Sequence, residues 1–234
     1  MLKINEIKTF YGKVGALWDV SLEIMAKEIV ALVGANGAGK TTLLNTISGL
    51  TIPASGTMEF LGVRIDGIPP HRIVQLGISH VPEGGNPFPD MTVRENLEMG
   101  AFLIEHWREK RETFAQVYGM FPMLEKRAGQ LASTLSGGER QMLAMGRGLM
   151  MRPKLCMFDE PSYGLAPVVV RELFASIKRL HAQGMTILIV EQNVLNALET
   201  SNKAYVLENG RVVLLGKSEE LLKNEHVKKA YLGL

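Results

Sequence analysis

The chain has 234 residues, of which 46% are hydrophobic and 21% are charged, so it can bury the core of one domain with an inserted subdomain. Its 26 basic and 24 acidic side chains give a formal charge of +2, which excludes a strong net field that would gather nucleic acid or an anionic membrane surface. The single cysteine, Cys156, excludes an intramolecular disulfide and indicates a small core residue in a reducing compartment.

The first part of the chain is expected to form short strands, at residues 2–9 and 21–25. Residues 1–9 lack the basic start and apolar stretch of a secretory signal, so we expect the protein to stay inside the cell. No apolar stretch approaches the roughly 20 residues that a membrane-spanning helix needs. Any membrane role must therefore come through a partner.

Continuous apolar runs occur at residues 29–33, 155–158 and 186–190. Each run stands beside helical patterns, which is typical of buried strands in a parallel sheet. The sequence therefore predicts an α/β fold with a mostly parallel core sheet.

The stretch from about residue 86 to 134 is polar and helix-forming, and buried-strand signals occur before and after it but not inside it. Thr92 and Glu95 have the spacing of a capping box, so a helix should start there. We expect residues 1–85 and 136–234 to form the core, and about residues 86–135 to form a helical insert.

The end of the chain is predicted to contain a β-hairpin and a short helix. Strand-like residues 204–207 and 211–215 flank an Asn-Gly pair at 209–210, which is a strong hairpin turn signal. Ser218, followed by two glutamates, suits the start of a terminal helix because acidic groups favour the positive end of the helix dipole.

A glycine-rich segment, GANGAGKT at residues 34–41, follows the expected strand at 29–33 and is named here the phosphate loop. Its glycines let backbone N–H groups turn inward around a phosphate, and the helix expected from Lys40 adds its N-terminal dipole. Lys40 is expected to reach the β- and γ-phosphates, and the Thr41 hydroxyl to hold Mg²⁺. An ordinary glycine-rich turn is the alternative. The expected nucleotide-binding residues here are Gly34, Asn36, Gly37, Gly39, Lys40, Thr41 and Thr42.

Two carboxylates, Asp159 and Glu160, directly follow the expected strand at 155–158. The carboxyl ends of strands are where open α/β sheets bind ligands. Asp159 is expected to face Mg²⁺, and Glu160 to polarise the water that attacks the γ-phosphate. Taken alone, such a pair is more often a solvated loop, but a phosphate loop in the same chain favours the catalytic interpretation.

A second phosphate-seeking helix start occurs at residues 135–141, LSGGERQ, named here the signature segment. Gly137 and Gly138 at a helix start leave backbone N–H groups bare and directed at an anion, and Ser136 precedes them. One nucleotide needs only one phosphate loop. Either a second nucleotide binds here, or the segment covers the nucleotide of another copy, unless it is merely a loop and helix cap.

The phosphate loop, the signature segment and the run LCMFDEP at 155–161 together resemble the ABC ATPase family in order and spacing, over essentially the whole chain. The resemblance implies a phosphate-loop NTPase core of the RecA-like type, an N-terminal antiparallel β subdomain and a helical subdomain that carries the signature segment. It also implies a head-to-tail dimer in which Ser136, Gly137 and Gly138 of one copy close on ATP held by the other. Tyr11 matches the aromatic that stacks on adenine. Without the resemblance, Tyr11 is a half-buried strand aromatic.

The chain looks closest to ATPase subunits of branched-chain amino-acid importers, from the runs VPEG at 81–84, GLAP at 164–167 and VEQN at 190–193. The resemblance places Glu83 in the loop that senses Mg²⁺ and Gln192 where most members have the histidine at the γ-phosphate. Gln192 cannot take up a proton near neutral pH, which leaves Glu160 as the general base, unless Gln192 only caps the sheet edge and hydrolysis is weak. The arginine expected after Gly84 is Gly85 here, a departure from the subfamily pattern.

The resemblance implies an ATP- and Mg²⁺-dependent subunit on the cytoplasmic face of the cell membrane, held there by permease subunits and served indirectly by a solute-binding protein. The working pair is a homodimer or a heterodimer with a related ATPase, and nucleic acid is not an expected partner. An importer of urea or another small amide, a soluble ABC ATPase without a transport role, and a nucleotide-gated module without useful turnover are the alternatives.

Overall fold

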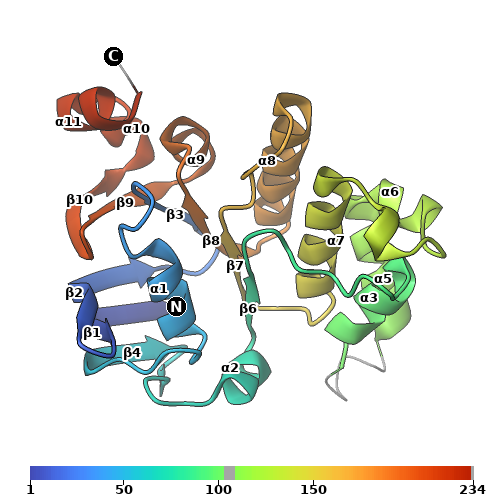
Figure 1. The fold of residues 1–234 in the computed structure, drawn as a ribbon, viewed down its shortest axis with the longest axis horizontal. Helices are drawn as coiled ribbons and strands as arrows, with labels where there is room; N and C mark the ends of the chain where they lie inside the picture. Colours follow the sequence, from blue (N-terminus) through green and yellow to red (C-terminus); the bar gives the residue numbers. More distant parts are fainter. Residues whose placement is uncertain (103–108, 233–234) are drawn as a thin grey trace.

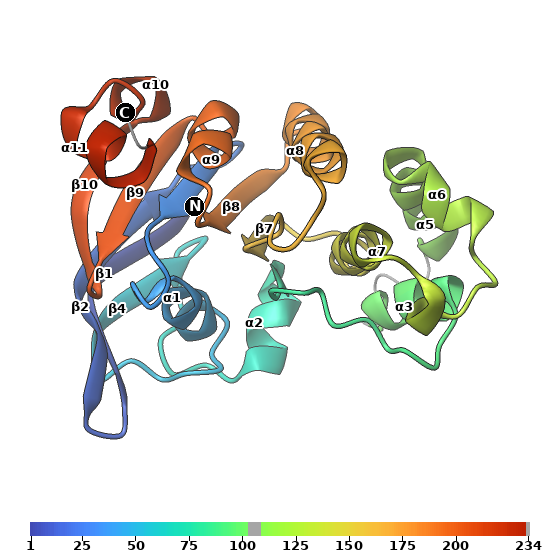
Figure 2. The same cartoon turned by 45° about the horizontal axis from the view of Figure 1, so that its top comes forward.

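A computed structural model of the chain describes residues 1–102 and 109–232, and Figures 1 and 2 show their arrangement. The two β-sheets lie side by side, and the helices α3, α5 and α6 form the end of the molecule farthest from the strands β1 and β2. The strand order is β2-β1-β4-β5 in the four-stranded sheet and β10-β9-β3-β8-β7-β6 in the six-stranded sheet. In the part of the chain that the structure describes, no helix is both long and apolar enough to cross a bilayer.

The six-stranded sheet has a parallel core, because β9, β3, β8, β7 and β6 run in the same direction and only the edge strand β10 is antiparallel. Its strands are β3 (Ile29–Val33), β6 (Ile78–Val81), β7 (Leu155–Asp159), β8 (Thr186–Glu191), β9 (Lys203–Glu208) and β10 (Arg211–Lys217). Every residue of β3, β7 and β8 is buried, which confirms the three strands predicted from continuous apolar runs. Their carboxyl ends consequently meet at one edge of the sheet.

Side chains alternate between the two faces of this sheet. Leu155 and Met157 of β7 pack with helix α1 (Lys40–Ile47), whereas Cys156 and Phe158 pack with α7 (Gly137–Leu149) and α8 (Pro167–Ala182). Cys156 is fully buried, as predicted. The two faces of β7 therefore belong to two separate apolar clusters, and a third cluster joins β3 and β9 to α9 (Val194–Thr200). Helices cover both sides of the sheet, as a parallel sheet requires.

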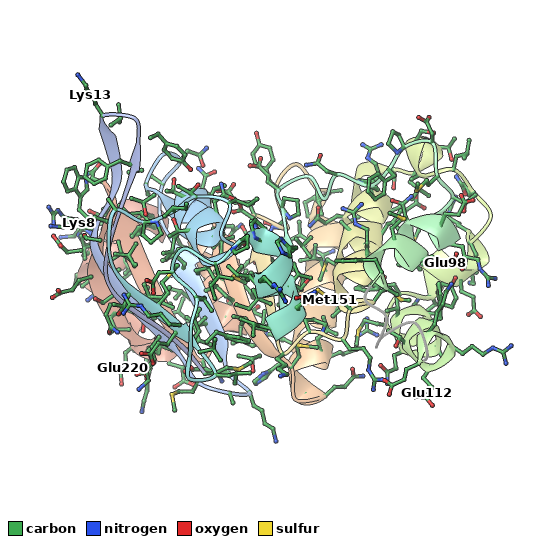
Figure 3. The ribbon with its side chains drawn as sticks, turned by 90° about the horizontal axis from the view of Figure 1, so that it is seen from below. Lys8, Lys13, Glu98, Glu112, Met151 and Glu220 are labelled. Atoms are coloured by element: carbon green, nitrogen blue, oxygen red, sulfur yellow. The ribbon has the colours of Figure 1, made fainter. Side chains whose placement is uncertain are left out.

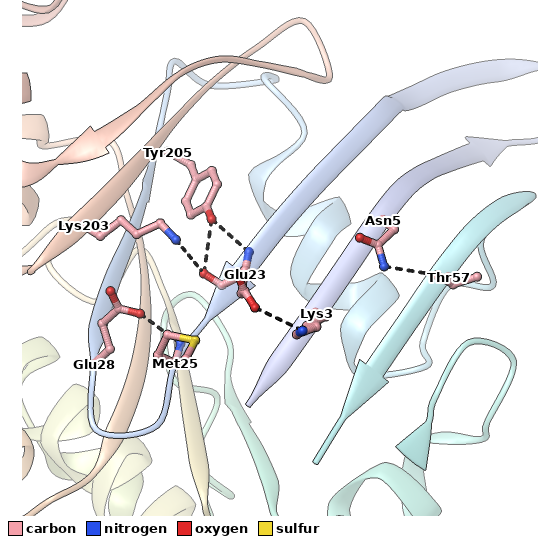
Figure 4. Close-up of polar contacts among 8 residues, drawn as sticks. All are labelled: Lys3, Asn5, Glu23, Met25, Glu28, Thr57, Lys203 and Tyr205. Carbon is pink, nitrogen blue, oxygen red and sulfur yellow. Dashed lines mark hydrogen bonds and ion pairs between the residues drawn. The ribbon is translucent and has the colours of Figure 1, made fainter. Parts of the chain in front are cut away.

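The antiparallel sheet is built from β1 (Leu2–Tyr11), β2 (Val14–Ile24), β4 (Ser55–Phe60) and β5 (Val63–Arg64). The prediction of a strand at 21–25 captured only the end of β2, which begins at Val14 after a tight turn. Figure 4 shows how this sheet is tied to the central one: the Tyr205 hydroxyl accepts from the Glu23 N–H at 2.9 Å, and Lys203 donates to the Glu23 carbonyl at 3.2 Å.

The described residues between 86 and 134 contain helices and no strand. The helices are α3 (Val93–Gly100), α5 (Lys110–Met120), α6 (Pro122–Lys126) and a 3₁₀ turn (Ala132–Thr134). The capping box predicted for the first of them is present, since the Glu95 N–H donates to Thr92 Oγ1 at 3.2 Å and the Thr92 N–H donates to Glu95 Oε2 at 2.7 Å. Figure 3 shows Glu98 and Glu112 of these helices at the end of the molecule opposite Lys13 in the β1–β2 turn.

The remaining helices are α2 (Pro70–Leu76), α9 (Val194–Thr200), α10 (Ser218–Leu221), α11 (Glu225–Val227) and a π-helix (Lys228–Leu232). The predicted hairpin with its Asn-Gly turn is present as β9 and β10. The predicted helix start at Ser218 is confirmed, because α10 begins at that residue and Lys217 precedes it as the N-cap. The Ser218 hydroxyl lies 2.7 Å from the Ser201 hydroxyl, so it joins the helix to the end of α9.

Candidate functional site

The phosphate loop leaves the carboxyl end of β3 and curls over the N-terminus of α1. Gly37 and Gly39 adopt φ angles of 79° and 105°, which favour glycine because a side chain is strained there. At Gly34 a Cβ atom would lie 2.2 Å from the Leu207 carbonyl oxygen, so only glycine lets the loop pass β9. The loop therefore presents its backbone N–H groups at a helix start, an arrangement suited to phosphate.

A pocket of about 310 Å³ opens above this loop. It brings together residues from the phosphate loop, from the loop after β6 and from the segment after β7. The lining residues are Ala16, Asn36, Gly37, Gly39, Lys40, Thr41, Thr42, Glu83, Glu160 and Tyr163.

Lys40 is buried at the floor of this pocket and uses all three of its ammonium hydrogens. Its Nζ atom donates to the carbonyl oxygens of Gly34 at 2.9 Å and Ala35 at 3.1 Å, and it pairs with Glu160 Oε1 at 3.0 Å. The sequence predicted that Lys40 reaches the β- and γ-phosphates and that Glu160 acts on the water at the γ-phosphate. The geometry adds that they contact each other directly.

Asp159 ends β7 with a buried carboxylate whose Oδ1 atom has no hydrogen-bond partner among the described residues. Burial, together with the charges of Glu160 and Glu83, raises the pKa of Asp159 to about 6, although a hydrogen bond with Thr41 and the charge of Lys40 oppose the rise. An orphaned carboxylate oxygen beside a hydroxyl and a second carboxylate is an all-oxygen donor set of the kind that Mg²⁺ prefers. The residues expected to hold Mg²⁺, Thr41, Glu83 and Asp159, therefore fit that ion.

Glu160 adopts a φ angle of 42°, which is disfavoured for a residue with a side chain. A hydrogen bond from its N–H to the Val190 carbonyl oxygen, 2.8 Å long, holds it against the end of β8. Backbone strain of this kind persists only where surrounding contacts hold it, and such positions gather at functional sites.

Gln192 is exposed, follows β8 directly and does not line the pocket above the phosphate loop. A neighbouring hollow of about 270 Å³ is lined by Glu160, Ser162, Tyr163, Glu191, Gln192 and Asn193. Sequence reasoning assigned no role to Glu191 or Ser162, although the Ser162 N–H donates to Glu191 Oε1 at 3.0 Å. The signal that could have revealed Glu191 is its position, since it is a charged residue at the end of an otherwise apolar strand.

Tyr11 lies at the end of β1 with half of its surface exposed. Burial opposes ionisation of its phenol, but side-chain hydrogen bonds with Thr42, Thr51 and Asn45 outweigh burial and lower its pKa. Thr42 also lines the main pocket. The ring therefore stands beside the pocket with an accessible surface, although it does not line the pocket itself.

The signature segment lies apart from the pocket. Ser136 is the N-cap residue of α7. Figures 1 and 2 both show α7 apart from α1, the helix that follows the phosphate loop. None of residues 135–141 lines the pocket. The helix start is less bare than predicted, because the Glu139 N–H donates to Ser136 Oγ at 3.4 Å and Glu139 accepts from the Ser136 N–H at 2.8 Å. The backbone N–H groups of Gly137 and Gly138 take no part in this capping box.

A mostly apolar groove of about 350 Å³ is lined by residues of α2, β6, α3 and α7 and of the loop after β6. Arg147 of α7 donates to the carbonyl oxygens of Gly85 and Asn86, each at 3.0 Å, and stands over the Phe88 ring at 5.1 Å. The residues that line the groove are Val74, Ser79, His80, Val81, Pro82, Phe88, Met99, Gly100, Phe102, Ala144, Arg147, Gly148 and Met151. The loop that carries Glu83 is thereby fastened to the helix that the signature segment begins.

Comparison with known proteins agrees with this geometry. A family model described as ABC transporter matches residues 17–163. The chain is 46% identical over its full length to all of the high-affinity branched-chain amino acid transport ATP-binding protein BraG of Pseudomonas aeruginosa. It is 39% identical, over 100% of the chain and 99% of the relative, to the probable branched-chain amino acid transport ATP-binding protein LivF of Archaeoglobus fulgidus.

One solved structure with the same fold is the dimeric post-hydrolysis state of the ATP-binding cassette MJ0796 bound to ADP and Pi. It superposes with a TM-score of 0.81 and 26% identity, over 93% of this chain and 99% of that one.

Proposed function

The chain belongs to the ABC transporter family as an ATP-hydrolysing subunit, and from that premise we propose that it powers an importer of branched-chain amino acids. The observation that supports this substrate assignment is the full-length match to BraG, at 46% identity. The subunit works at the cytoplasmic face of the membrane, where permease subunits hold it and a solute-binding protein delivers the cargo to them.

Nucleotide binding rests on the phosphate loop. Its amides and the N-terminus of α1 accept the β-phosphate, and the Lys40 ammonium exchanges its contact with Glu160 for the β- and γ-phosphate oxygens. The half-exposed ring of Tyr11 stacks on adenine. Asn36, Gly37, Gly39, Thr41 and Thr42 complete the phosphate contacts around the pocket.

Thr41, Asp159 and Glu83 would hold the Mg²⁺ that accompanies ATP, and the bound ion would supply positive charge that offsets the negative charge of the phosphates. The orphaned Oδ1 atom of Asp159 supports this role, because a buried carboxylate oxygen is costly unless something binds it.

Hydrolysis is assigned to Glu160 and Gln192. Once Lys40 turns to the phosphates, the Glu160 carboxylate accepts a proton from the attacking water. Gln192 donates an amide hydrogen to the γ-phosphate and takes no part in proton transfer, since an amide does not titrate in this range.

The separation of the phosphate loop from Ser136 within one chain supports a head-to-tail pair. In that pair Ser136, Gly137 and Gly138 of one copy contact the γ-phosphate held by the other, so ATP closes the dimer and hydrolysis releases it. The partner copy is a second molecule of this chain or a related ATPase subunit. The apolar groove between the central sheet and α3 receives the permease.

The test is uptake. The subunit is reconstituted in lipid vesicles with the permease and binding protein produced from the same genome region, and ATP-dependent accumulation of labelled leucine, isoleucine, valine and urea is measured. Uptake of the three amino acids by the parent, and none by the Glu160→Gln variant, supports the proposal. Uptake of urea alone, or of none of the four, refutes the assigned substrate.

The composite site has its own test, by sedimentation with and without Mg-ATP. Glu160→Gln keeps both phosphate contacts but removes the base, so closed dimers with trapped ATP should accumulate. Ser136→Arg should bind ATP about as well as the parent and fail to dimerise, because a bulky group blocks closure on the γ-phosphate. Dimers of Ser136→Arg as abundant as those of Glu160→Gln would refute the composite site.

A further inference from the structure

Glu191 is a buried carboxylate to which the assignments above give no task. It ends β8 with 2% of its surface exposed, and it pairs in the sheet with Val33, the residue before the phosphate loop. No arginine, lysine or histidine of the described residues forms an ion pair with it within 4.0 Å. The nearby charge of Glu160 is of the same sign. Burying a carboxylate in such a place is unfavourable unless several donors satisfy it.

Donors from two different loops do so. The Ser162 N–H donates to Glu191 Oε1 at 3.0 Å, and the Ser162 hydroxyl and the Asn193 backbone also hydrogen-bond to the carboxylate. Burial raises the pKa of Glu191, and these hydrogen bonds oppose the rise. A carboxylate is the one common side chain that offers only acceptors, which is what two converging sets of N–H and O–H groups need.

The two loops are those that carry the residues assigned to hydrolysis. Ser162 lies two residues after Glu160, and the Tyr163 N–H returns to the Glu160 carbonyl oxygen at 3.1 Å. Asn193 follows Gln192 directly. A second bond, from the Glu160 N–H to the Val190 carbonyl oxygen, fixes the same loop to the strand residue before Glu191. Glu160 is therefore held in its disfavoured backbone conformation from both sides.

We propose that Glu191 is a positioning residue for ATP hydrolysis, which holds the loop after Glu160 and the loop of Gln192 in one fixed arrangement at the γ-phosphate. The inference rests on the proposed roles of Glu160 and Gln192. Glu191 does not line the pocket above the phosphate loop, so its loss should lower turnover and leave ATP binding in place.

The test uses the full chain and compares Glu191→Ala, Glu191→Gln and Glu199→Ala. Glu199 is an exposed carboxylate on α9 and serves as the matched control. Because a displacement of about 1 Å at a reacting group lowers turnover about 100-fold, kcat of Glu191→Ala should fall by that order while KM for Mg-ATP stays within about twofold. Glu191→Gln keeps one acceptor for Ser162, so it should recover most of the lost rate. Glu199→Ala should match the parent.

Amide exchange provides the second measurement. The Ser162 and Asn193 amides should lose protection in Glu191→Ala and keep it in Glu199→Ala. Parental kcat in Glu191→Ala, or a KM that rises in step with the fall in kcat, overturns the proposal. If Glu191→Ala does not fold, Glu191→Gln is measured in its place. A large fall in the kcat of Glu191→Gln while its Ser162 amide keeps parental protection overturns the proposal. Parental turnover in Glu160→Gln, measured alongside, would instead show that the proposed base is wrong.

Discussion

The ion pair between Lys40 and Glu160 is the residue-scale feature that determines how the site behaves before ATP arrives. Each partner is nearly inaccessible, with side-chain exposures of 3% and 9%, and each keeps the other satisfied. Phosphate oxygens offer Lys40 more negative charge than one carboxylate does, so we expect ATP to displace Glu160 from it. The proposed base is thus freed by the substrate on which it acts.

Lys40→Ala should lower the affinity for Mg-ATP by about 100-fold, since it removes a charge-assisted contact to the phosphates and leaves Glu160 as an unpaired buried carboxylate facing them. Equilibrium titration with Mg-ATP measures the change. Lys178→Ala, at an exposed position on α8, is the control and should bind as the parent does. Near-parental affinity in Lys40→Ala would show that the pocket is not the phosphate site.

His80 should make the protein sensitive to mild acid. The Ser48 hydroxyl gives its only hydrogen to the Leu44 carbonyl oxygen, so His80 Nδ1, 2.9 Å away, must be the donor between them, and buried Nε2 has no partner among the described residues. Burial lowers the pKa of His80 to about 4. An unfolded histidine titrates near about 6.5, so below that pH the unfolded chain binds a proton that the folded chain does not, and stability falls as pH falls toward about 4.

His80→Asn keeps a donor for Ser48 and removes the titration. From pH 7 to pH 5, the free energy of unfolding of the parent should fall by about 2 kcal/mol more than that of the variant. Urea unfolding of both proteins at the two pH values measures this difference. Parallel pH profiles would show that the unfolded and folded states bind protons alike at His80.

At the scale of elements, the loop between β6 and α3 is pressed onto α7. Gly84 and Gly85 have nearly equal φ angles of 67° and 68°, but a Cβ atom at Gly84 meets nothing within 4 Å, whereas one at Gly85 would lie 2.5 Å from Ala144 Cβ. An arginine at Gly85, as the subfamily pattern leads one to expect, does not fit this conformation of the loop. The glycine lets the loop reach Arg147.

The pair Gly84→Ala and Gly85→Ala separates backbone strain from this close contact. Both should destabilise the fold through their positive φ, and Gly85→Ala should cost about 1–3 kcal/mol more because it overpacks the contact with α7. Denaturant unfolding of the two variants under identical conditions gives the difference. Equal stabilities would mean that the loop moves away from α7 without cost.

The elements that the sequence predicted well are those whose signal is local. β3, β7 and β8 are continuous apolar runs, and the turn at Asn209 adopts the positive φ of 49° that an Asn-Gly pair favours. The first half of β2 was missed because register shifts against β1 and a positive φ at Asp19 disturb its alternation. The tie between Glu191 and Ser162 spans 29 residues and forms only when β7 and β8 lie together, so no local pattern contains it.

At the scale of the whole molecule, the apolar groove beside α3 is the surface proposed for the permease. Met99 lines it with 45% of its surface exposed, and Figure 3 shows Met151, another lining residue, in the middle of the molecule between its two ends. An apolar surface of this size, open to solvent and next to a loop of the nucleotide site, suits a helical segment of the partner.

Met99→Glu should reduce co-purification with the permease at least about tenfold without changing ATP binding, because docking would bury an unpaired charge. Leu215→Glu is the matched control, since Leu215 is exposed to a similar degree, 54%, on the distant strand β10. Loss of assembly in both variants, or in neither, would point to a different docking surface.

The distance between Ser136 and the phosphate loop of the same chain also governs how defects combine. In the proposed head-to-tail pair, each site joins the phosphate loop of one chain to the signature segment of the other. When a Ser136→Arg chain pairs with a Lys40→Ala chain, both substitutions therefore lie in the same site. The other site has an unchanged phosphate loop and an unchanged signature segment. Two proteins that are each inactive should therefore complement one another when mixed. When the permease, and not ATP, holds the two chains together, pairing is random. With independent sites, the mixture should then recover about a quarter of the parental hydrolysis.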